Sequence, residues 1–176
     1  WAKDMRYIHD NPLAGLKKER VVDIVGKEDG KPPAIYSIAE SRMLLDGTLE
    51  SKYERLLPVF VLGFFCGLRA SELLSANWED IVMDSEDAYI AVGSDKAKSR
   101  IHRNVDIAKN AIDWLSQCDP KSGPIFEWSR SAYDRMRRSL HAHVGVELKA
   151  NGLRHSFGSY LYAFNGDEVA TAFQLG

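Results

Sequence analysis

The charged residues that could do chemistry lie at the boundaries of predicted elements rather than along helix faces. Arg69 is the first: in "FFCGLRASELL" it stands between an apolar run and the start of a helix. Burying a guanidinium group among such neighbours costs several kcal/mol unless an anion meets it. Glu72, three residues further on, could supply that anion in an internal salt bridge. The alternative is a negatively charged ligand.

A second basic group falls in the turn between two predicted strands, where residues 96–105 contain no acidic residue. Its members are Lys96, Lys98, Arg100 and Arg103. A third group opens the helix of "NGLRHSFGSY", which contains Arg154 and His155. Arginine presents a planar fork to two oxygens, whereas lysine can also give up a proton. Two arginines and a lysine that converged from these segments would therefore form a phosphate clamp.

The elements that must position these groups are mostly helices. "SIAE" at residues 37–40 is a capping box ahead of the first helix. An apolar stripe predicts a second helix over about residues 51–65, which Pro58 either starts or bends. Gly67 ends that helix, and "RASELLSANW" is typical of a short third one.

The middle of the chain changes period. "WEDIVMD", "AYIAVG" and "RIHRNVDIA" are short segments between acidic or polar turns, which predicts three antiparallel strands. Helices return in "KNAIDWLSQC", "SAYDRMRRSLHAHV", "GLRHSFGSYLYAF" and "DEVATAFQL", with Ser131 and Asp134 as an expected capping pair. The predicted fold class is α+β and predominantly α-helical, with about six or seven helices around a small three-stranded antiparallel sheet.

Composition and charge narrow the class of protein. The 176 residues, 45% hydrophobic and 27% charged, suit one globular domain. No apolar run approaches the ~20 residues of a membrane span, so no membrane partner is expected. Cys66 and Cys118 form no CxxC pair and predict buried, reduced thiols in a cytosolic protein. His141 and His143 lie two apart on a predicted helix, which does not favour a metal site.

The net charge of −2 conceals a strong segregation of charge along the chain. Residues 1–95 carry 11 basic and 17 acidic side chains, whereas residues 96–155 carry 12 basic and 6 acidic ones. A basic middle of this kind is what a phosphate-binding face produces.

The motifs, taken in order, resemble the catalytic domain of tyrosine recombinases, the phage-integrase family. The resemblance rests on "GLRASELLSANWEDI", the basic hairpin, and "NGLRHSFGSYLY" followed by "ATAFQLG". "NPLAGLKK" is similar to the family's link from an N-terminal core-binding domain. We therefore expect residues 1–33 to be a lead-in from such a domain, and residues 34–176 to be a catalytic domain truncated at its C-terminus.

The resemblance implies site-specific DNA recombination or integration without a cofactor or a required metal. In that chemistry a tyrosine attacks a backbone phosphate, leaving a 3′-phosphotyrosyl link and a free 5′-hydroxyl. Arg69 and Arg154 would hold the non-bridging oxygens of the crowded, negative phosphorus centre. Lys98, or alternatively Lys96, would protonate the leaving 5′-oxygen, and Glu72 would support Arg69.

Two departures from the family pattern limit what this chain is expected to do. The first position of the family's HxxR pattern is Asn151, which can donate a hydrogen bond but cannot transfer a proton. The family's nucleophile lies shortly beyond the position of Gly176, so the chain as given is expected to be inactive. Tyr160 and Tyr162 come too early to replace it and are interpreted as packing residues.

Several of these residues also have a purely structural interpretation. Asn151 suits a helix N-cap as well as a substrate contact, and His155 suits a packed, hydrogen-bonded histidine as well as an acid or base. The arginines of the predicted helix near residue 135 would usually form a solvated face. If the domain binds DNA, they are candidates for sequence-independent phosphate contacts, as are those of the hairpin. The DNA-binding candidates are Arg100, Arg103, Arg135 and Arg138.

The expected partner is double-stranded DNA. The full-length protein would act as a tetramer on paired sites, whereas the fragment would be monomeric. We expect a cytoplasmic, nucleoid-associated protein of bacterial or phage origin. Two rivals remain: a non-catalytic DNA-binding relative, which Asn151 favours, and a helical protein-interaction domain that binds no DNA.

Overall fold

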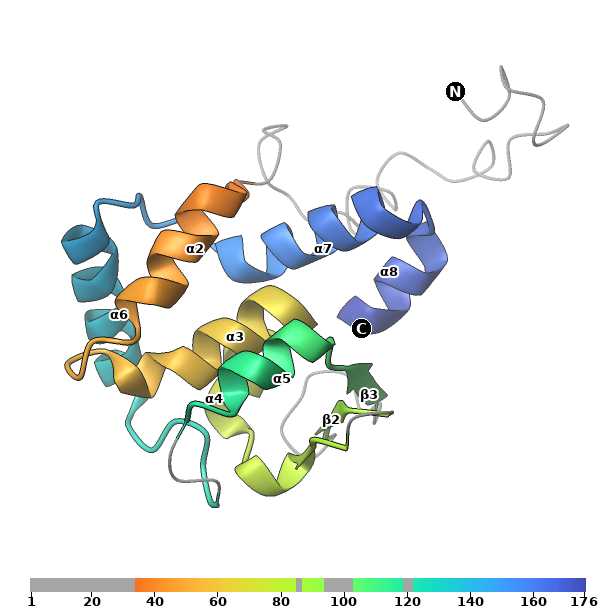
Figure 1. The fold of residues 1–176 in the computed structure, drawn as a ribbon, viewed down its shortest axis with the longest axis horizontal. Helices are drawn as coiled ribbons and strands as arrows, with labels where there is room; N and C mark the ends of the chain where they lie inside the picture. The colour runs from red at the N-terminus through yellow and green to blue at the C-terminus, as the bar shows by residue number, and fades with distance from the viewer. Residues whose placement is uncertain (1–33, 85–86, 94–102, 119–121) are drawn as a thin grey trace, which may run out of the picture. The chain divides into compact units, whose positions relative to one another are not determined.

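The computed structural model describes residues 34–84, 87–93, 103–118 and 122–176 (Figure 1). In chain order the elements are α2 (Ile38–Gly47), the 3-10 turn η1 (Glu54–Leu56), α3 (Leu57–Cys66), α4 (Ala70–Ser75), the 3-10 turn η2 (Trp78–Asp80), β1 (Ile81–Val82), β2 (Tyr89–Val92), β3 (Arg103–Asp106), α5 (Lys109–Leu115), α6 (Arg130–Val144), α7 (Gly152–Asn165) and α8 (Glu168–Leu175).

Helix α3 forms the centre because its sequence, LPVFVLGFFC, carries no charge, and nine of its 10 residues are buried. A helix that is apolar all round must be covered on every side, and α2, α4, α5 and α7 all contact it. Gly63 lets α7 approach closely, since a Cβ there would lie 2.7 Å from Cδ1 of Leu153. Pro58 lies in the first turn, so α3 begins there rather than bending.

The small sheet places one charged residue on its buried face. The three strands pair antiparallel in the order β1-β2-β3, as the sequence predicted. Ile90 lies opposite Val105, and Val92 lies opposite Arg103. Partners across a pair of strands share a face, and all four of these side chains are buried. Arg103, the first residue of β3, therefore points toward the interior.

Side-chain caps define where several helices begin. The capping box that starts α2 is confirmed: Ser37 Oγ accepts from the Glu40 N–H at 3.2 Å, and Glu40 Oε2 accepts from the Ser37 N–H at 2.7 Å. The predicted Ser131–Asp134 cap is wrong. Helix α6 starts earlier, with the Oγ of Ser129 accepting from the N–H of Ala132 at 3.3 Å.

The predicted fold class is confirmed for the described residues, which form seven α-helices and one three-stranded antiparallel sheet. None of the helices in this part of the chain is long and apolar enough to cross a membrane. The expected lead-in, residues 1–33, lies outside the described residues.

Candidate active site

The turn between α3 and α4 positions Arg69. Gly67 ends α3 in the left-handed conformation, with φ +63°, and a Cβ at this position would overlap the ring of Phe157 in α7. Only glycine meets both demands without strain. The chain then leaves the turn with Arg69 at the N-cap of α4 in an extended conformation. Its side chain is 41% exposed, so its donors can reach a ligand.

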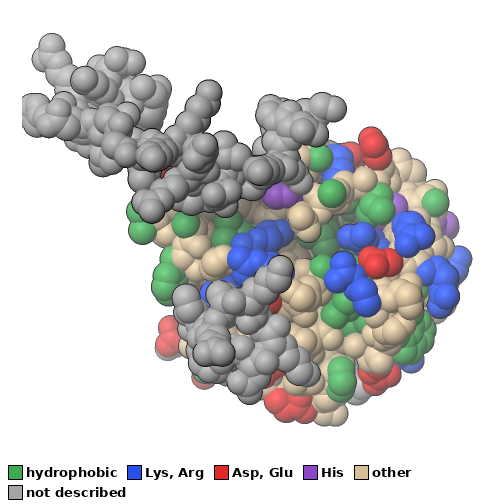
Figure 2. All heavy atoms as spheres, turned by 180° about the vertical axis from the view of Figure 1, so that it is seen from behind, with side chains coloured by type: hydrophobic (Ala, Val, Ile, Leu, Met, Phe, Trp, Pro, Cys, Tyr) green, Lys and Arg blue, Asp and Glu red, His purple; other side chains and the backbone are tan. Residues whose placement is uncertain are grey.

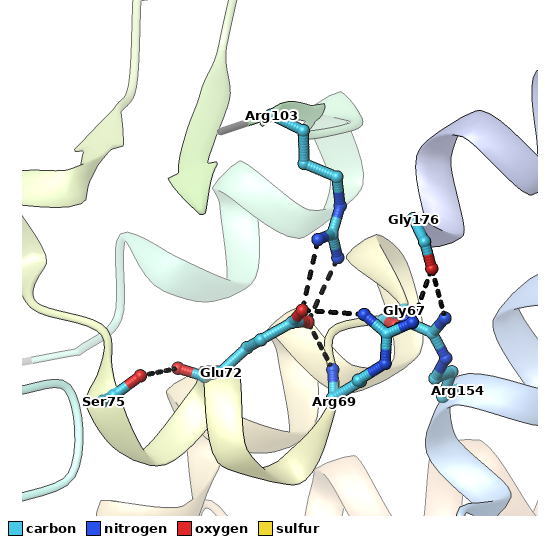
Figure 3. A network of polar contacts seen from close by, with 7 residues as sticks. All are labelled: Gly67, Arg69, Glu72, Ser75, Arg103, Arg154 and Gly176. Carbon is cyan, nitrogen blue, oxygen red and sulfur yellow. Dashed lines mark hydrogen bonds and ion pairs between the residues drawn. The ribbon is translucent and has the colours of Figure 1, made fainter. Parts of the chain in front are cut away.

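Glu72, in the first turn of α4, is the carboxylate that holds this region together (Figure 3). Its side chain is only 4% exposed. Arg69 donates to it twice, from the backbone N–H to Oε2 at 2.8 Å and from Nη1 to Oε1 at 3.0 Å. Burial disfavours its charged form, but the hydrogen bonds from Arg103 and Arg69 outweigh burial and lower its pKa. Glu72 is therefore held ionised, in the supporting position that the family resemblance implied.

Arg103 supplies the second half of this network. Its Nη1 and Nη2 donate to Oε1 and Oε2 of Glu72, each at 3.1 Å, and its side chain is 7% exposed. This bidentate geometry is the strong form of an arginine–carboxylate pair. The sequence suggested an exposed turn residue that contacts DNA. The structure instead places Arg103 in the interior as the partner of Glu72, because Arg103 is the first residue of β3 and lies on the buried face of that strand.

Arg154 approaches the same place from the first turn of α7. Its Nη1 donates to the carbonyl oxygen of Gly67 at 2.8 Å, and its Nη2 donates to that of Gly176 at 3.4 Å. Arg69 Nη2 donates to the same Gly176 oxygen at 2.5 Å. Two guanidinium groups from segments far apart in the sequence thus converge on one oxygen atom (Figure 3). The convergence that the sequence predicted for these two arginines is present.

The electrostatics of the site leave unmatched positive charge. Burial lowers the pKa of Arg154 to about 10, and repulsion from Arg69 adds to that effect while Glu72 opposes it. Arg154 nevertheless remains charged at neutral pH. Among the described side chains, the three neighbouring guanidinium groups of Arg69, Arg103 and Arg154 are joined to one carboxylate, that of Glu72. An anionic ligand would complete the balance.

Asn151 and His155 border the same site, and Asn151 does not act as the side-chain cap that its position suggested. Asn151 stands at the N-cap position of α7, yet its side chain makes no capping hydrogen bond. It adopts the left-handed region with φ +49°, which asparagine tolerates better than most residues. Capping by the Asn151 side chain therefore does not explain this residue. Asn151 and His155 both line the pocket described next.

A pocket of about 330 Å³ joins Arg69 and Arg154 to side chains of α6. Among the described residues, the charged lining is entirely basic: Arg69, Arg130, Arg137, Lys149 and Arg154, with His141 and His155 beside them. Lys and Arg side chains gather across the middle of the face drawn in Figure 2, and most acidic ones lie toward its rim. Arg135 and Arg138, which the sequence nominated for DNA binding, are exposed and outside this lining.

The sequence-based prediction selected Arg135 and Arg138 on α6 and left out Arg130 and Arg137, which line the pocket. The signal was present as helical spacing. Arg130, Asp134, Arg137 and His141 recur at intervals of three or four residues, which places them on one stripe. The hairpin residues Lys96, Lys98 and Arg100 lie outside the described residues, so their roles stay predictions.

Tyr160 and Tyr162, interpreted from the sequence as packing residues, are partly exposed and lie outside the pocket. Tyr160 Oη donates to the carbonyl oxygen of Tyr36 at 2.8 Å, and Tyr162 is outside the pocket. The Tyr36 hydroxyl lies 2.8 Å from Nε2 of His141 and accepts from the Lys149 N–H at 2.9 Å. Among the residues that the structure describes, no group of three or more His, Cys, Asp or Glu side chains could hold a metal ion.

The fold places the chain among the catalytic domains of tyrosine recombinases. It is similar to a solved XerA recombinase, with a TM-score of 0.67 and 20% identity over 88% of this chain and 59% of that one. It is also similar to the catalytic domain of the bacteriophage HP1 integrase, with a TM-score of 0.65 and 21% identity over 82% of this chain and 81% of that one.

Residues 34–172 match the phage integrase family, and the chain belongs to that family. It is 28% identical to tyrosine recombinase XerC of Pseudomonas fluorescens over 163 residues, covering 85% of this chain and 54% of the relative. It is 26% identical to the XerC of Caldanaerobacter subterraneus subsp. tengcongensis, covering 81% of this chain and 43% of that relative. The chain thus spans about half the length of the curated relatives that it matches.

Proposed function

We propose that the protein carrying this domain is a site-specific recombinase, which breaks and rejoins DNA through a 3′-phosphotyrosyl intermediate. The observation that carries the proposal is that Arg69 and Arg154, from segments far apart in the sequence, line one pocket with further basic side chains. Two fixed, charged donors at one point are what a developing phosphorane-like charge requires. The family match and the relatives named tyrosine recombinases support this chemistry.

Each residue has a role in this proposal. Arg69 and Arg154 bind the non-bridging oxygens of the scissile phosphate, and Asn151 adds a neutral hydrogen-bond donor. Lys98, with Lys96 as the alternative, protonates the leaving 5′-oxygen. Glu72 positions Arg69. The nucleophile is the tyrosine that the family resemblance places shortly after the position of Gly176.

The proposed partner is double-stranded DNA, on which the full-length protein assembles as a tetramer in a bacterial or phage-infected cell. A XerH recombinase of similar fold, with a TM-score of 0.63, was solved bound to its difH substrate. The Tn1549 transposon integrase, with a TM-score of 0.61, was solved with transposon right-end DNA. The basic pocket on this chain supports the same kind of ligand.

The test is formation of a covalent adduct between the full-length protein and a nicked suicide duplex. The duplex would carry a site selected from a random-sequence pool, and the adduct would be resolved on a denaturing gel. Wild type should form the adduct, and Arg69→Ala or Arg154→Ala should reduce it at least about a hundredfold, as loss of an oxyanion donor does. The matched control, Arg42→Ala, removes an exposed arginine paired with Asp46 and should behave as wild type. Adduct that forms equally well without Arg69 would refute the clamp.

A second candidate is a relative that binds DNA without cleaving it. Asn151 favours it, because an amide replaces the residue that could transfer a proton. Duplex binding with no adduct, from a full-length protein that has the expected tyrosine, would select this candidate. Asn151→His should then raise adduct yield if proton transfer at this position is what is missing.

A further inference from the structure

The pocket extends from Arg69 and Arg154 to a second basic site on α6. Arg130 and Arg137, here called the α6 arginine pair, lie seven residues apart on one stripe of that helix, and both line the pocket. The clamp and the α6 arginine pair therefore share one cavity although they come from different elements. Its volume of about 330 Å³ far exceeds the roughly 10–15 Å³ that a single water needs.

The α6 arginine pair is only partly neutralised. Both members share one carboxylate: Arg130 Nε lies 3.2 Å from Oδ2 of Asp134, and Arg137 Nη2 lies 3.5 Å from Oδ1. The Nε of Arg137 is buried and has no hydrogen-bond partner among the described residues. Lys149, by contrast, is fully engaged, with its Nζ 2.8 Å from each carboxylate oxygen of Glu40. The α6 arginine pair therefore keeps at least one donor that no described residue satisfies.

The α6 arginine pair also has a rigid support. The ring of buried Tyr133 lies beneath it, with its centroid 5.2 Å from Cζ of Arg137 and 6.0 Å from Cζ of Arg130. A guanidinium group that stacks on a ring keeps its N–H donors in its own plane. The carbonyl of Arg137 accepts from Nδ1 of His141 at 2.8 Å, which ties the backbone to a buried side chain. These contacts hold the donors in place before a ligand arrives.

We propose that the α6 arginine pair binds a second backbone phosphate of the DNA, neighbouring the one held by Arg69 and Arg154. The inference rests on the proposed function, since it assigns the DNA a second contact in the same cavity. A phosphodiester fits because the described part of the pocket lining carries no carboxylate and the pair shares a single one, that of Asp134. The contact is independent of base sequence and fixes how the strand enters the clamp. The α6 arginine pair is thus a positioning site.

The test measures duplex binding by the full-length protein as a function of salt. Each lost phosphate contact lowers the slope of log K against log salt by about 0.9. We expect the double variant Arg130→Gln/Arg137→Gln to show a slope about 0.9 smaller than wild type. The matched control, Arg42→Gln/Arg55→Gln, removes two ion-paired arginines away from the pocket and should keep the wild-type slope. Arg130→Gln alone changes a side chain that is 56% exposed, so it tests the site without risk to folding.

A second readout separates positioning from chemistry. Higher DNA concentration should restore adduct formation by the double variant, whereas it should not restore Arg154→Ala. An unchanged slope in the double variant, or an equal fall in the control, would overturn the second phosphate site. Wild type that binds no duplex at low salt would overturn both this site and the proposed function. If the salt slopes are as expected but wild type never forms an adduct, the proposed catalysis is refuted and the second phosphate site is supported.

Discussion

Two arginine–carboxylate networks in this domain have the same stoichiometry and opposite character. Arg69 and Arg103 share Glu72, and Arg130 and Arg137 share Asp134. The first carboxylate is 4% exposed and makes a bidentate pair with both contacts at 3.1 Å. The second is 26% exposed, and its two contacts lie at 3.2 and 3.5 Å. Burial makes the Glu72 network a rigid scaffold, whereas the Asp134 network keeps its arginines available to a ligand.

The largest effect should come from neutralising the buried carboxylate. Glu72→Gln leaves Arg69 and Arg103 facing each other without an anion, and breaking a buried pair in this way costs about 3–5 kcal/mol. Thermal or urea unfolding would measure the loss. Glu127→Gln, which breaks the exposed pair with Arg55, is the matched control and should cost about 1 kcal/mol or less. Equal losses in the two variants would contradict the contrast between buried and exposed carboxylates.

Removing Arg103 should have the next largest effect. Arg103→Gln costs roughly 2–3 kcal/mol in unfolding free energy, less than loss of Glu72, because Glu72 keeps both donors of Arg69. Adduct yield should fall with it, since Glu72 positions Arg69. Arg103→Lys should restore charge but not the bidentate geometry, so recovery should be partial. If Arg103→Lys matched wild type in both stability and adduct yield, the bidentate guanidinium contact with Glu72 would be dispensable.

Acid should destabilise the protein through the Glu72 network. The pKa of Glu72 is lowered in the folded state, so its stabilising contribution is complete above its ordinary value of 4.5 and is lost as the pH falls below it. Melting temperatures recorded from pH 7 to pH 3 should therefore drop more steeply for wild type than for Glu72→Gln. A Glu72→Gln curve parallel to wild type would contradict the role of Glu72.

The smallest effect on stability should come from Asp134. Asp134→Asn removes a partly exposed partner and should change the unfolding free energy by no more than about 1 kcal/mol. Because it frees the α6 arginine pair, DNA binding at moderate salt should become tighter. Glu127→Gln, which frees Arg55 outside the pocket, is the matched control and should leave affinity unchanged. Weaker binding by Asp134→Asn would indicate that Asp134 aims the arginines rather than competing for them.

Much of the scaffold could be predicted from local pattern. The strand segments, the Ser37 capping box and the ends of α3 follow from period, cap and turn chemistry that act within a few residues. The convergence of Arg69 and Arg154 could not be predicted that way, because it depends on the packing of α3 against α7. The family resemblance supplied it instead.

The errors share a physical cause. Arg103 was assigned to a basic turn by its charge, although it keeps the alternation of buried Val105 and Ile107 and therefore belongs to the inner face of the strand. Arg135 and Arg138 were selected on α6, although helical spacing places Arg130 and Arg137 on the stripe that lines the pocket. In both cases the prediction relied on the charge of the residues, whereas their spacing along the strand or helix indicates which face they occupy.

Gly67 contacts both arginine motifs, so the two motifs must remain compatible with each other as the sequence changes. Its left-handed turn directs the chain to Arg69, and its lack of a side chain leaves room for the ring of Phe157. Its carbonyl oxygen accepts a hydrogen bond from Arg154. A chimera that takes the first motif from one relative and the α7 motif from another must match at this residue. The fit between the ring and the turn therefore limits how freely the two halves of the site can be exchanged.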